Sequence, residues 1–338
     1  MSPRIAVNGL GRIGKLFLRA AIDGGMDAEI VFVNDAVGDP ATHAHLLTFD
    51  TVQGAWDREV TADGESLLLD RRRIPVHRAG RIEDLPLADA AIDLVVDCTG
   101  VFKTTEKVRP YFDAGVERVL VSAPIHEPDA LNLIYGVNDH LYDPERHRLV
   151  TATSCTTNCL APVVKVVHEA LGIRHGMMTT IHDATNTQTL VDRPAKDLRR
   201  ARSALNSLIP TTTGSARAIG LVYPELEGRL NGHAVRVPLL TGSLIDCVFE
   251  LSRATDTDTV NELFAAAAEA GPLAGILGYE SRPLVSSDFC HDPRSAIVDG
   301  PSTMVVAGTQ LKVYAWYDNE WAYACRMCDI VRRMAATS

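Results

Sequence analysis

The stretch that decides the fold is IAVNGLGRIG, residues 5–14. Its apolar start predicts a strand, its middle matches the pattern G-x-G-x-x-G, and the residues from Gly14 to Ile22 predict a helix. In this setting Gly9 permits a tight turn, Gly11 lets a pyrophosphate approach the backbone, and Gly14 lets the helix pack closely against the strand. Unpaired N–H groups at the helix start favour the anion. We therefore predict a dinucleotide-binding site here.

An acidic residue supports the same site from the next strand. Asp35 follows the apolar run of residues 30–33 and lies 21 residues after Gly14. A carboxylate at this position can accept hydrogen bonds from the adenosine ribose, and it repels a 2′-phosphate, so the sequence favours NAD over NADP. The alternative is a glycine turn in an α/β domain that binds no nucleotide, and that reading leaves the acid unexplained.

The pattern of apolar residues divides the chain into two parts. Up to about residue 154, short apolar runs at residues 5–7, 30–33, 94–96 and 119–121 alternate with helical stretches. Such runs are typical of a parallel sheet that helices cover on both faces. Beyond that point, longer strands are predicted at residues 177–181, 234–238, 243–251 and 311–317, and helices at residues 159–171, 260–270 and 321–336.

These patterns predict an α/β fold with three segments. A Rossmann-type dinucleotide-binding domain is expected over residues 1–154. An α+β catalytic domain with a mostly antiparallel sheet is expected over residues 155–319, and residues 320–338 are expected to form a C-terminal helix that returns to the first domain.

Composition limits the class of function. The chain has 338 residues, of which 46% are hydrophobic and 22% are charged, and its net charge is −10. A dedicated nucleic-acid binder needs a strongly basic face, so we do not expect a nucleic-acid partner. No apolar run approaches the roughly 20 residues of a membrane helix, so no membrane association is expected. Seven cysteines, an odd number, argue against a disulfide framework and for a cytoplasmic location.

A candidate nucleophile stands at the start of the second predicted domain. Cys155, in the segment SCTTN of residues 154–158, comes at a strand-to-helix junction, where backbone amides and the helix dipole favour a thiolate. His182 ends the predicted strand through residues 178–181, and an imidazole beside a thiol can hold the thiolate and shuttle a proton. Taken alone, either residue could be structural. No metal is expected, because Cys155 and Cys159 lack a second ligand cluster at zinc spacing.

A thiolate beside a nicotinamide indicates one chemistry. The sulfur adds to an aldehyde to give a thiohemiacetal, a hydride leaves to NAD to give a thioester, and a nucleophile such as phosphate releases the acyl group. With these residues in view, the sequence resembles the phosphorylating glyceraldehyde-3-phosphate dehydrogenase family along essentially its whole length. The shared motifs are NGLGRIG at residues 8–14, SCTTN at 154–158, TIH at 180–182, DLRRAR at 197–202, IPTTTG at 209–214, RVP at 236–238 and WYDNE at 316–320.

The resemblance implies a role for each site residue. Cys155 is the implied nucleophile and His182 the implied base. NAD contacts are implied for Gly9, Gly11, Arg12, Ile13, Gly14, Asp35, Thr99, Ser122 and Asn319. The acceptor anion is assigned to Ser154, Thr156, Thr213 and Gly214, and the substrate phosphate to Thr185, Arg200 and Arg236. The family also implies glycolytic D-glyceraldehyde 3-phosphate as substrate and a homotetramer, with the segment around residues 183–206 reaching towards a neighbour.

Three stretches are similar to a narrower subgroup associated with arsenate resistance. They lie at residues 138–144, 181–189 and 278–285. In that subgroup arsenate replaces phosphate as the acyl acceptor. Because the two oxyanions share charge and tetrahedral shape, one site can take either, and the sequence leaves the physiological acceptor open.

Alternative functions also remain at this point. Erythrose-4-phosphate oxidation would use the same residues, and a cofactor-binding interaction protein with a silent site would use only the nucleotide fold. Arg193 stands where NAD-specific members usually carry leucine, and a cation there could tolerate a 2′-phosphate. Asp35 opposes that, so NAD remains the expected cofactor.

Overall fold

The computed structural model describes residues 2–336, which divide into two compact units. The first unit comprises the described parts of residues 1–135, 139–154 and 324–338, and the second comprises residues 136–138 and 155–323. The domain boundaries expected from the sequence differ from this division at residues 136–138. They differ again in the last helix, which changes unit at residue 324 rather than 320.

A doubly wound parallel sheet forms the centre of the first unit. Its parallel strands are β1 (Arg4–Asn8), β2 (Glu29–Asn34), β8 (Leu94–Asp97), β9 (Arg118–Val121), β10 (Ala130–Asn132) and β11 (Leu149–Thr151). In space they follow the order β10-β11-β9-β8-β1-β2, so the chain moves outward from β1 first to β2 and later, on the other side, to β8. Ligands of such sheets bind at the carboxyl ends of the strands beside this switch point.

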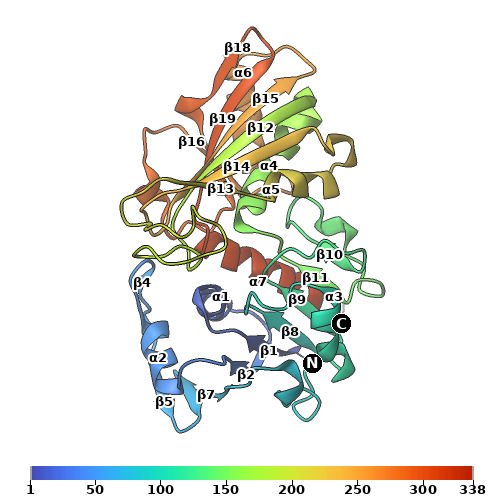
Figure 1. The fold of residues 1–338 in the computed structure, drawn as a ribbon. Helices are drawn as coiled ribbons and strands as arrows, with labels where there is room; N and C mark the ends of the chain where they lie inside the picture. The colour runs from blue at the N-terminus through green and yellow to red at the C-terminus, as the bar shows by residue number, and fades with distance from the viewer. Residues whose placement is uncertain (1, 337–338) are drawn as a thin grey trace. The chain divides into compact units, whose positions relative to one another are not determined.

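Helices α1 (Arg12–Asp23) and α3 (Thr105–Asp113) accompany this sheet, and α2 (Pro40–Thr48) follows β2 (Figure 1). One face of the sheet packs on α3, where Val108 and Tyr111 join Ala6, Val95 and Val119 in a core that excludes water. The final helix α7 (Trp321–Ala335) reaches α1, because the Cys328 thiol lies 3.8 Å from the Phe17 carbonyl. The apolar runs of the sequence are therefore the buried strands of this sheet.

Three further strands extend the sheet beyond β2 and were not predicted. They are β5 (Val60–Asp63), β6 (Ser66–Leu69) and β7 (Arg72–His77), with β7 parallel to β2 and the other two antiparallel. Arg72, Arg73 and Pro75 are exposed while Ile74 and Val76 are buried. Polar and apolar residues alternate along β7 in this half-exposed edge of the sheet. A prediction based on continuous apolar runs does not identify such a strand. A short hairpin, β3 (Phe49–Asp50) with β4 (Gly54–Ala55), precedes it.

The second unit is built on one mixed sheet. Its strands are β12 (Ile173–His182), β13 (Ile209–Thr212), β14 (Leu230–Arg236), β15 (Ser243–Leu251), β16 (Leu277–Glu280), β17 (Ala296–Asp299), β18 (Met304–Val306) and β19 (Gln310–Tyr317). Two pairings, β12 with β14 and β16 with β17, are parallel, and the other five are antiparallel. Helices α4 (Cys155–Leu171) and α6 (Thr257–Glu269) pack against this sheet, and α5 (Ser215–Ala218) is a short turn beside α4 (Figure 1).

The predicted fold class is confirmed in both units. The strand expected at residues 234–238 begins earlier, at Leu230, because Asn231, Gly232 and His233 continue the pairing with β12 although they are not apolar. Helix α4 also begins earlier than the predicted residue 159. Among residues 2–336, no helix is both long enough and apolar enough to span a membrane.

Candidate active site

A cavity of about 220 Å³ opens at the carboxyl ends of β1, β2 and β8 in the first unit. Its lining includes Gly9, Gly11, Asp35 and Thr99, all predicted to contact the cofactor. Both oxygens of Asp35 accept backbone hydrogen bonds, from Leu10 N at 2.7 Å and Val37 N at 2.9 Å. The carboxylate is therefore fixed beside the glycine loop, at the switch point where dinucleotides bind.

The three glycines of the loop meet different surroundings. A Cβ on Gly14 would lie 1.9 Å from the Gly9 carbonyl oxygen, so this glycine is needed for helix α1 to approach the strand. Gly9 has φ of +97°, and a Cβ there would lie 2.6 Å from the Thr99 nitrogen. A Cβ on Gly11 would meet no protein atom within 4 Å. The protein itself does not require glycine at this position, so the open space above it fits a ligand that approaches the backbone.

Buried polar side chains hold the strand ends beneath this cavity. Asn34 donates to the Asn8 oxygen at 2.7 Å, Asn8 donates to the Tyr111 hydroxyl at 2.5 Å, and Tyr111 donates to Asp97 at 2.7 Å. Asp97 also accepts from the Thr99 hydroxyl at 2.8 Å. Because buried polar networks are rigid when satisfied, Thr99 is presented from a fixed frame.

The other predicted cofactor residues of this unit lie near the same loop or strand ends. Arg12, the first residue of α1, pairs with the buried Asp50 carboxylate at 2.5 Å. Ile13 follows it in the first turn, and Ser122 directly follows β9, its backbone N–H bonding to the Asp97 carbonyl at 2.9 Å. The sequence patterns did not reveal this pairing, since Asp50 lies in the separate hairpin after α2.

Alanine at two of the glycines should separate binding from folding. In Gly11→Ala the new methyl group meets only the open space, so we expect unchanged thermal stability and about 10–100-fold weaker NAD binding. In Gly14→Ala the methyl group collides with the backbone, so both NAD binding and stability should fall, stability by roughly 1–3 kcal/mol. Calorimetric titration with NAD and thermal unfolding measure the two effects. Tight NAD binding by the Gly11→Ala variant would contradict this placement.

The candidate nucleophile and base lie at the ends of two elements in the second unit. Cys155 is the first residue of α4, and His182 is the last residue of β12. The Cys155 Sγ atom lies 3.5 Å from His182 Nε2, and His182 is 4% exposed. A thiol at a helix start and beside an imidazole has both of the features that favour a thiolate.

A buried tyrosine connects the elements that carry this pair. The Tyr317 hydroxyl bonds to the hydroxyl groups of Thr156 at 2.9 Å and Thr180 at 2.8 Å. Its ring meets the His182 ring edge-on, with centroids 6.0 Å apart. Helix α4, β12 and β19 are thus joined directly beneath the sulfur and the imidazole.

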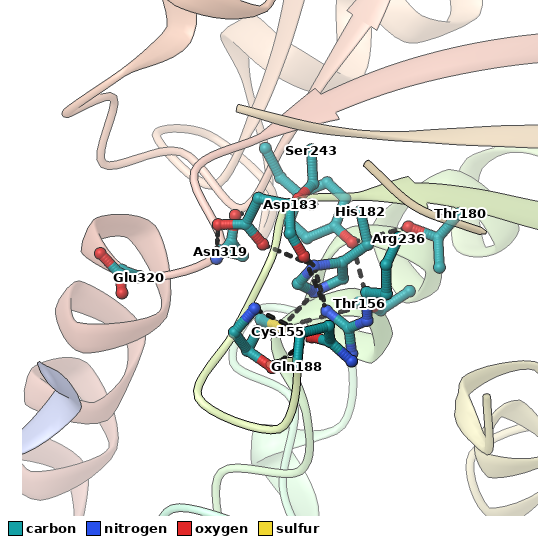
Figure 2. Close-up of polar contacts among 12 residues, drawn as sticks. Cys155, Thr156, Thr180, His182, Asp183, Gln188, Arg236, Ser243, Asn319 and Glu320 are labelled. Atoms are coloured by element: carbon teal, nitrogen blue, oxygen red, sulfur yellow. Dashed lines mark hydrogen bonds and ion pairs between the residues drawn. The ribbon is translucent and has the colours of Figure 1, made fainter. Parts of the chain in front are cut away.

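The second nitrogen of His182 faces a polar network (Figure 2). Its Nδ1 atom lies 2.6 Å from Asp183 Oδ1 and 2.5 Å from Arg236 Nη1. The other carboxylate oxygen of Asp183 accepts from Asn319 Nδ2 at 2.8 Å, and Ser243 donates to Asn319 Oδ1 at 2.9 Å. The side chain of Asn319 is therefore oriented, and one hydrogen of its amide remains for a ligand.

This network gives stability a pH dependence of defined sign. Burial lowers the pKa of His182, but its bond to Asp183 and its pairing with Cys155 raise that pKa from 6.5 to about 9. The stability that comes from protonated His182 is therefore full below pH 6.5 and is lost as pH rises through about 9. We expect the free energy of unfolding in urea to fall by roughly 3 kcal/mol over that range. In His182→Asn the free energy of unfolding should fall less over the same pH range. A fall as large as that of the wild type would contradict the expectation.

The structure connects some of the predicted anion-binding residues and places others in separate loops. Thr156 and Arg236 belong to the network around His182. Thr185 bonds within its own turn, to Gln188 at 3.1 Å, and Arg200 bonds to Thr211 on β13 at 2.9 Å. Thr213 bonds to Ser215 at 3.1 Å, next to Gly214 at the start of α5, and Ser154 directly precedes α4.

Sequence reasoning missed three residues of the second unit, namely Asp183, Ser243 and Tyr317. Asp183 directly follows His182, and an acidic residue adjoining a candidate base was a signal that could have been used. Ser243 and Tyr317 lie far from His182 in the sequence. The pairing of β12, β15 and β19 brings Ser243 to Asp183 and Tyr317 to the His182 ring. A dinucleotide-type cavity and a thiol–imidazole pair in one chain are typical of a nicotinamide-dependent oxidoreductase.

Comparison with known proteins is consistent with this class. The family model for the NAD-binding domain of glyceraldehyde 3-phosphate dehydrogenase matches residues 3–105, and the model for its C-terminal domain matches residues 154–319. The chain is 57% identical over 335 residues to glyceraldehyde-3-phosphate dehydrogenase 3 of a Nostoc species, covering 99% of both chains. It is 45% identical to glyceraldehyde-3-phosphate dehydrogenase 2 of Streptomyces avermitilis over 98% of both chains, and 45% identical to the Geobacillus stearothermophilus enzyme over 99%.

The chain therefore belongs to the glyceraldehyde-3-phosphate dehydrogenase family. It is an enzyme of that family with NAD as its cofactor, and the predicted family, enzyme class and cofactor are confirmed.

Proposed function

We propose that the enzyme oxidises D-glyceraldehyde 3-phosphate through a covalent intermediate on Cys155, with His182 as the acid and base. The observation that carries this proposal is the separation of 3.5 Å between Cys155 Sγ and His182 Nε2. The names of the relatives support the substrate, since each is called a glyceraldehyde-3-phosphate dehydrogenase.

In the first step the Cys155 thiolate attacks the aldehyde carbon. A C–S bond forms, and the carbonyl oxygen takes the proton of the His182 imidazolium to give a thiohemiacetal. Neutral His182 then removes that proton as the hydride leaves the carbon, and a thioester remains. Bound NAD supplies the hydride acceptor.

An oxyanion completes the turnover. Its oxygen attacks the thioester carbon, the C–S bond breaks, and the sulfur leaves as a thiolate beside protonated His182. We assign this acceptor anion to Ser154, Thr156, Thr213 and Gly214, and the substrate phosphate to Thr185, Arg200 and Arg236. Arg236 suits the second role because a guanidinium can bind phosphate through two parallel hydrogen bonds.

The cavity of the first unit supports the cofactor assignments at Gly9, Gly11, Asp35 and Thr99, which line it. Gly9, Gly11, Arg12, Ile13 and Gly14 would receive the pyrophosphate, and Asp35 the adenosine ribose. Thr99, Ser122 and Asn319 would serve the nicotinamide half. The fixed Asp35 carboxylate favours NAD over NADP, in opposition to the exposed Arg193.

We further propose a cytoplasmic homotetramer. The segment of residues 183–206 exposes Leu190, Val191 and Leu198 by 70%, 71% and 80%, and several large apolar side chains exposed in one short segment support a role in a protein interface. All seven cysteines, which lie within the described residues, are free thiols, as expected in a reducing compartment.

One assay tests the reaction, the acceptor and the cofactor. NADH formation is followed with glyceraldehyde 3-phosphate in the presence of phosphate, of arsenate, or of neither. Steady turnover is expected with either oxyanion and only a single-turnover burst without one. The ratio of kcat/KM for arsenate and phosphate then decides whether the arsenate-linked subgroup is the right one.

Parallel runs with erythrose 4-phosphate and with NADP test the alternatives. A higher kcat/KM with erythrose 4-phosphate would replace the proposed substrate, and equal rates with NADP would overturn the role of Asp35. The absence of any NADH with all substrates would support the interaction protein with a silent site.

A further inference from the structure

Asp183 lies at the centre of the network around His182 and takes no part in the steps proposed above. It is 2% exposed, and its two carboxylate oxygens face different residues. Oδ1 forms the ion pair with His182 Nδ1 at 2.6 Å, and Oδ2 accepts from Asn319 Nδ2 at 2.8 Å. One buried carboxylate thus connects the candidate base with a candidate cofactor residue.

Three groups lie close to His182 Nδ1: the Arg236 guanidinium at 2.5 Å, the Asp183 carboxylate at 2.6 Å and the Asp183 backbone carbonyl oxygen at 3.0 Å. The Arg236 guanidinium can only donate a hydrogen bond, so it favours an unprotonated Nδ1. The Asp183 carboxylate can only accept, so it favours a protonated one. Arg236 also has a second acceptor, the Asp183 carbonyl oxygen at 3.1 Å. The backbone carbonyl oxygen can accept from Nδ1 whether the ring is neutral or charged, so it is the negative charge of the Asp183 carboxylate that favours the imidazolium over the neutral ring.

The remaining groups around His182 do not replace this charge. Cys155 faces the other ring nitrogen, and Tyr317 meets the ring edge-on with its hydroxyl bonded to two threonines. A buried carboxylate without a cationic partner costs several kcal/mol, which favours a proton on the neighbouring imidazole. An imidazolium, in turn, favours the thiolate form of Cys155 across the ring.

We propose that Asp183 is a positioning residue that holds His182 as the imidazolium with its proton on Nδ1, and so maintains the Cys155 thiolate. This inference rests on the proposed function of Cys155 and His182. The same carboxylate fixes the amide of Asn319. One side chain therefore positions both the candidate base His182 and the candidate cofactor residue Asn319.

The test is the pH profile of Cys155 alkylation in the full-length enzyme. Iodoacetamide reacts with the thiolate. Mass spectrometry of the peptide that contains Cys155 measures the rate of alkylation, and this measurement does not require catalytic turnover. Asp183→Asn keeps an oxygen for Asn319 but presents no charge to His182. We expect the alkylation rate near neutral pH to fall about tenfold, with the midpoint moved upward by about one pH unit.

A second variant without the carboxylate charge and a matched control distinguish an effect of the lost charge from an effect of a disturbed structure. Asp183→Ser should show the same shift, which keeps the test available if Asp183→Asn does not fold. Ser243→Ala removes the hydroxyl that holds Asn319 and the Asp183 N–H, but it keeps the carboxylate, so its midpoint should not move. An unmoved midpoint in both charge-free variants, or an equal shift in Ser243→Ala, would overturn the proposal.

Steady-state kinetics separate this inference from the proposed function. In Asp183→Asn we expect kcat to fall about 10–100-fold, less than the roughly 10²–10⁴-fold typical for loss of the acid–base residue itself because His182 is still present, while KM for NAD stays near the wild-type value. If Cys155→Ser retains activity, the proposed function fails. If only the alkylation midpoint is unaffected in Asp183→Asn, the role of Asp183 fails and the function of Cys155 stands.

Discussion

Replacing Cys155 with serine is expected to lower kcat for NADH formation by about 10⁴-fold or more, because the proposed mechanism forms its acyl intermediate on a thiolate and a serine hydroxyl is not ionised at neutral pH. NAD binding should persist, since the glycine loop and Asp35 belong to the other unit. The assay uses glyceraldehyde 3-phosphate with phosphate, and NAD affinity is measured by calorimetric titration.

Cys159→Ser is the matched control for this variant. Cys159 lies one turn further along α4, is fully buried, and has its sulfur 3.9 Å from the Ala315 carbonyl. Burial raises the pKa of this thiol well above its ordinary value, so it remains uncharged at neutral pH. We expect Cys159→Ser to keep its activity. Turnover by Cys155→Ser at the wild-type rate would refute the assignment of the nucleophile.

Replacing His182 with asparagine is expected to lower kcat by roughly 10²–10⁴-fold, the usual scale for a general acid–base residue. The wild-type imidazole has its pKa raised to about 9, so over the whole neutral range it holds the proton that the proposed mechanism transfers to the aldehyde oxygen. Asparagine supplies neither that proton nor a positive charge beside the sulfur. Cys155 alkylation near neutral pH should therefore slow together with turnover.

The control for His182→Asn lies on the same strand. His175 is on β12 as well, but its side chain is exposed, so His175→Asn should leave kcat and the alkylation profile unchanged. If His182→Asn gave the alkylation–pH profile of the wild type, His182 would have no place in the mechanism.

Much of this arrangement is local in the sequence and could be predicted from it. The loop of residues 8–14 contains strand, turn and helix in one short stretch, so its role follows from spacing alone. Likewise, Cys155 and His182 each end or begin an element, and side chains at such ends are available for chemistry. Their separation of 3.5 Å is a consequence of tertiary packing that no local pattern contains.

Other features depend on contacts between distant segments. Ser243 reaches Asn319 only because β15 pairs with β19. Arg12 forms an ion pair with Asp50, which lies in a hairpin beyond α2. Apolar runs do not predict strand β7, because its side chains point alternately to solvent and to the core. In each case the missing information is the pairing of strands or the packing of loops, which apolar periodicity does not specify.

The hydroxyl group of Tyr317 has a consequence for the proposed reaction. It ties the first turn of α4 to β12, so the sulfur and the imidazole are carried by one rigid frame rather than by mobile loops. The entropic cost of bringing these two side chains together is therefore met when the chain folds, so the proposed reaction with an aldehyde would begin on a preorganised pair.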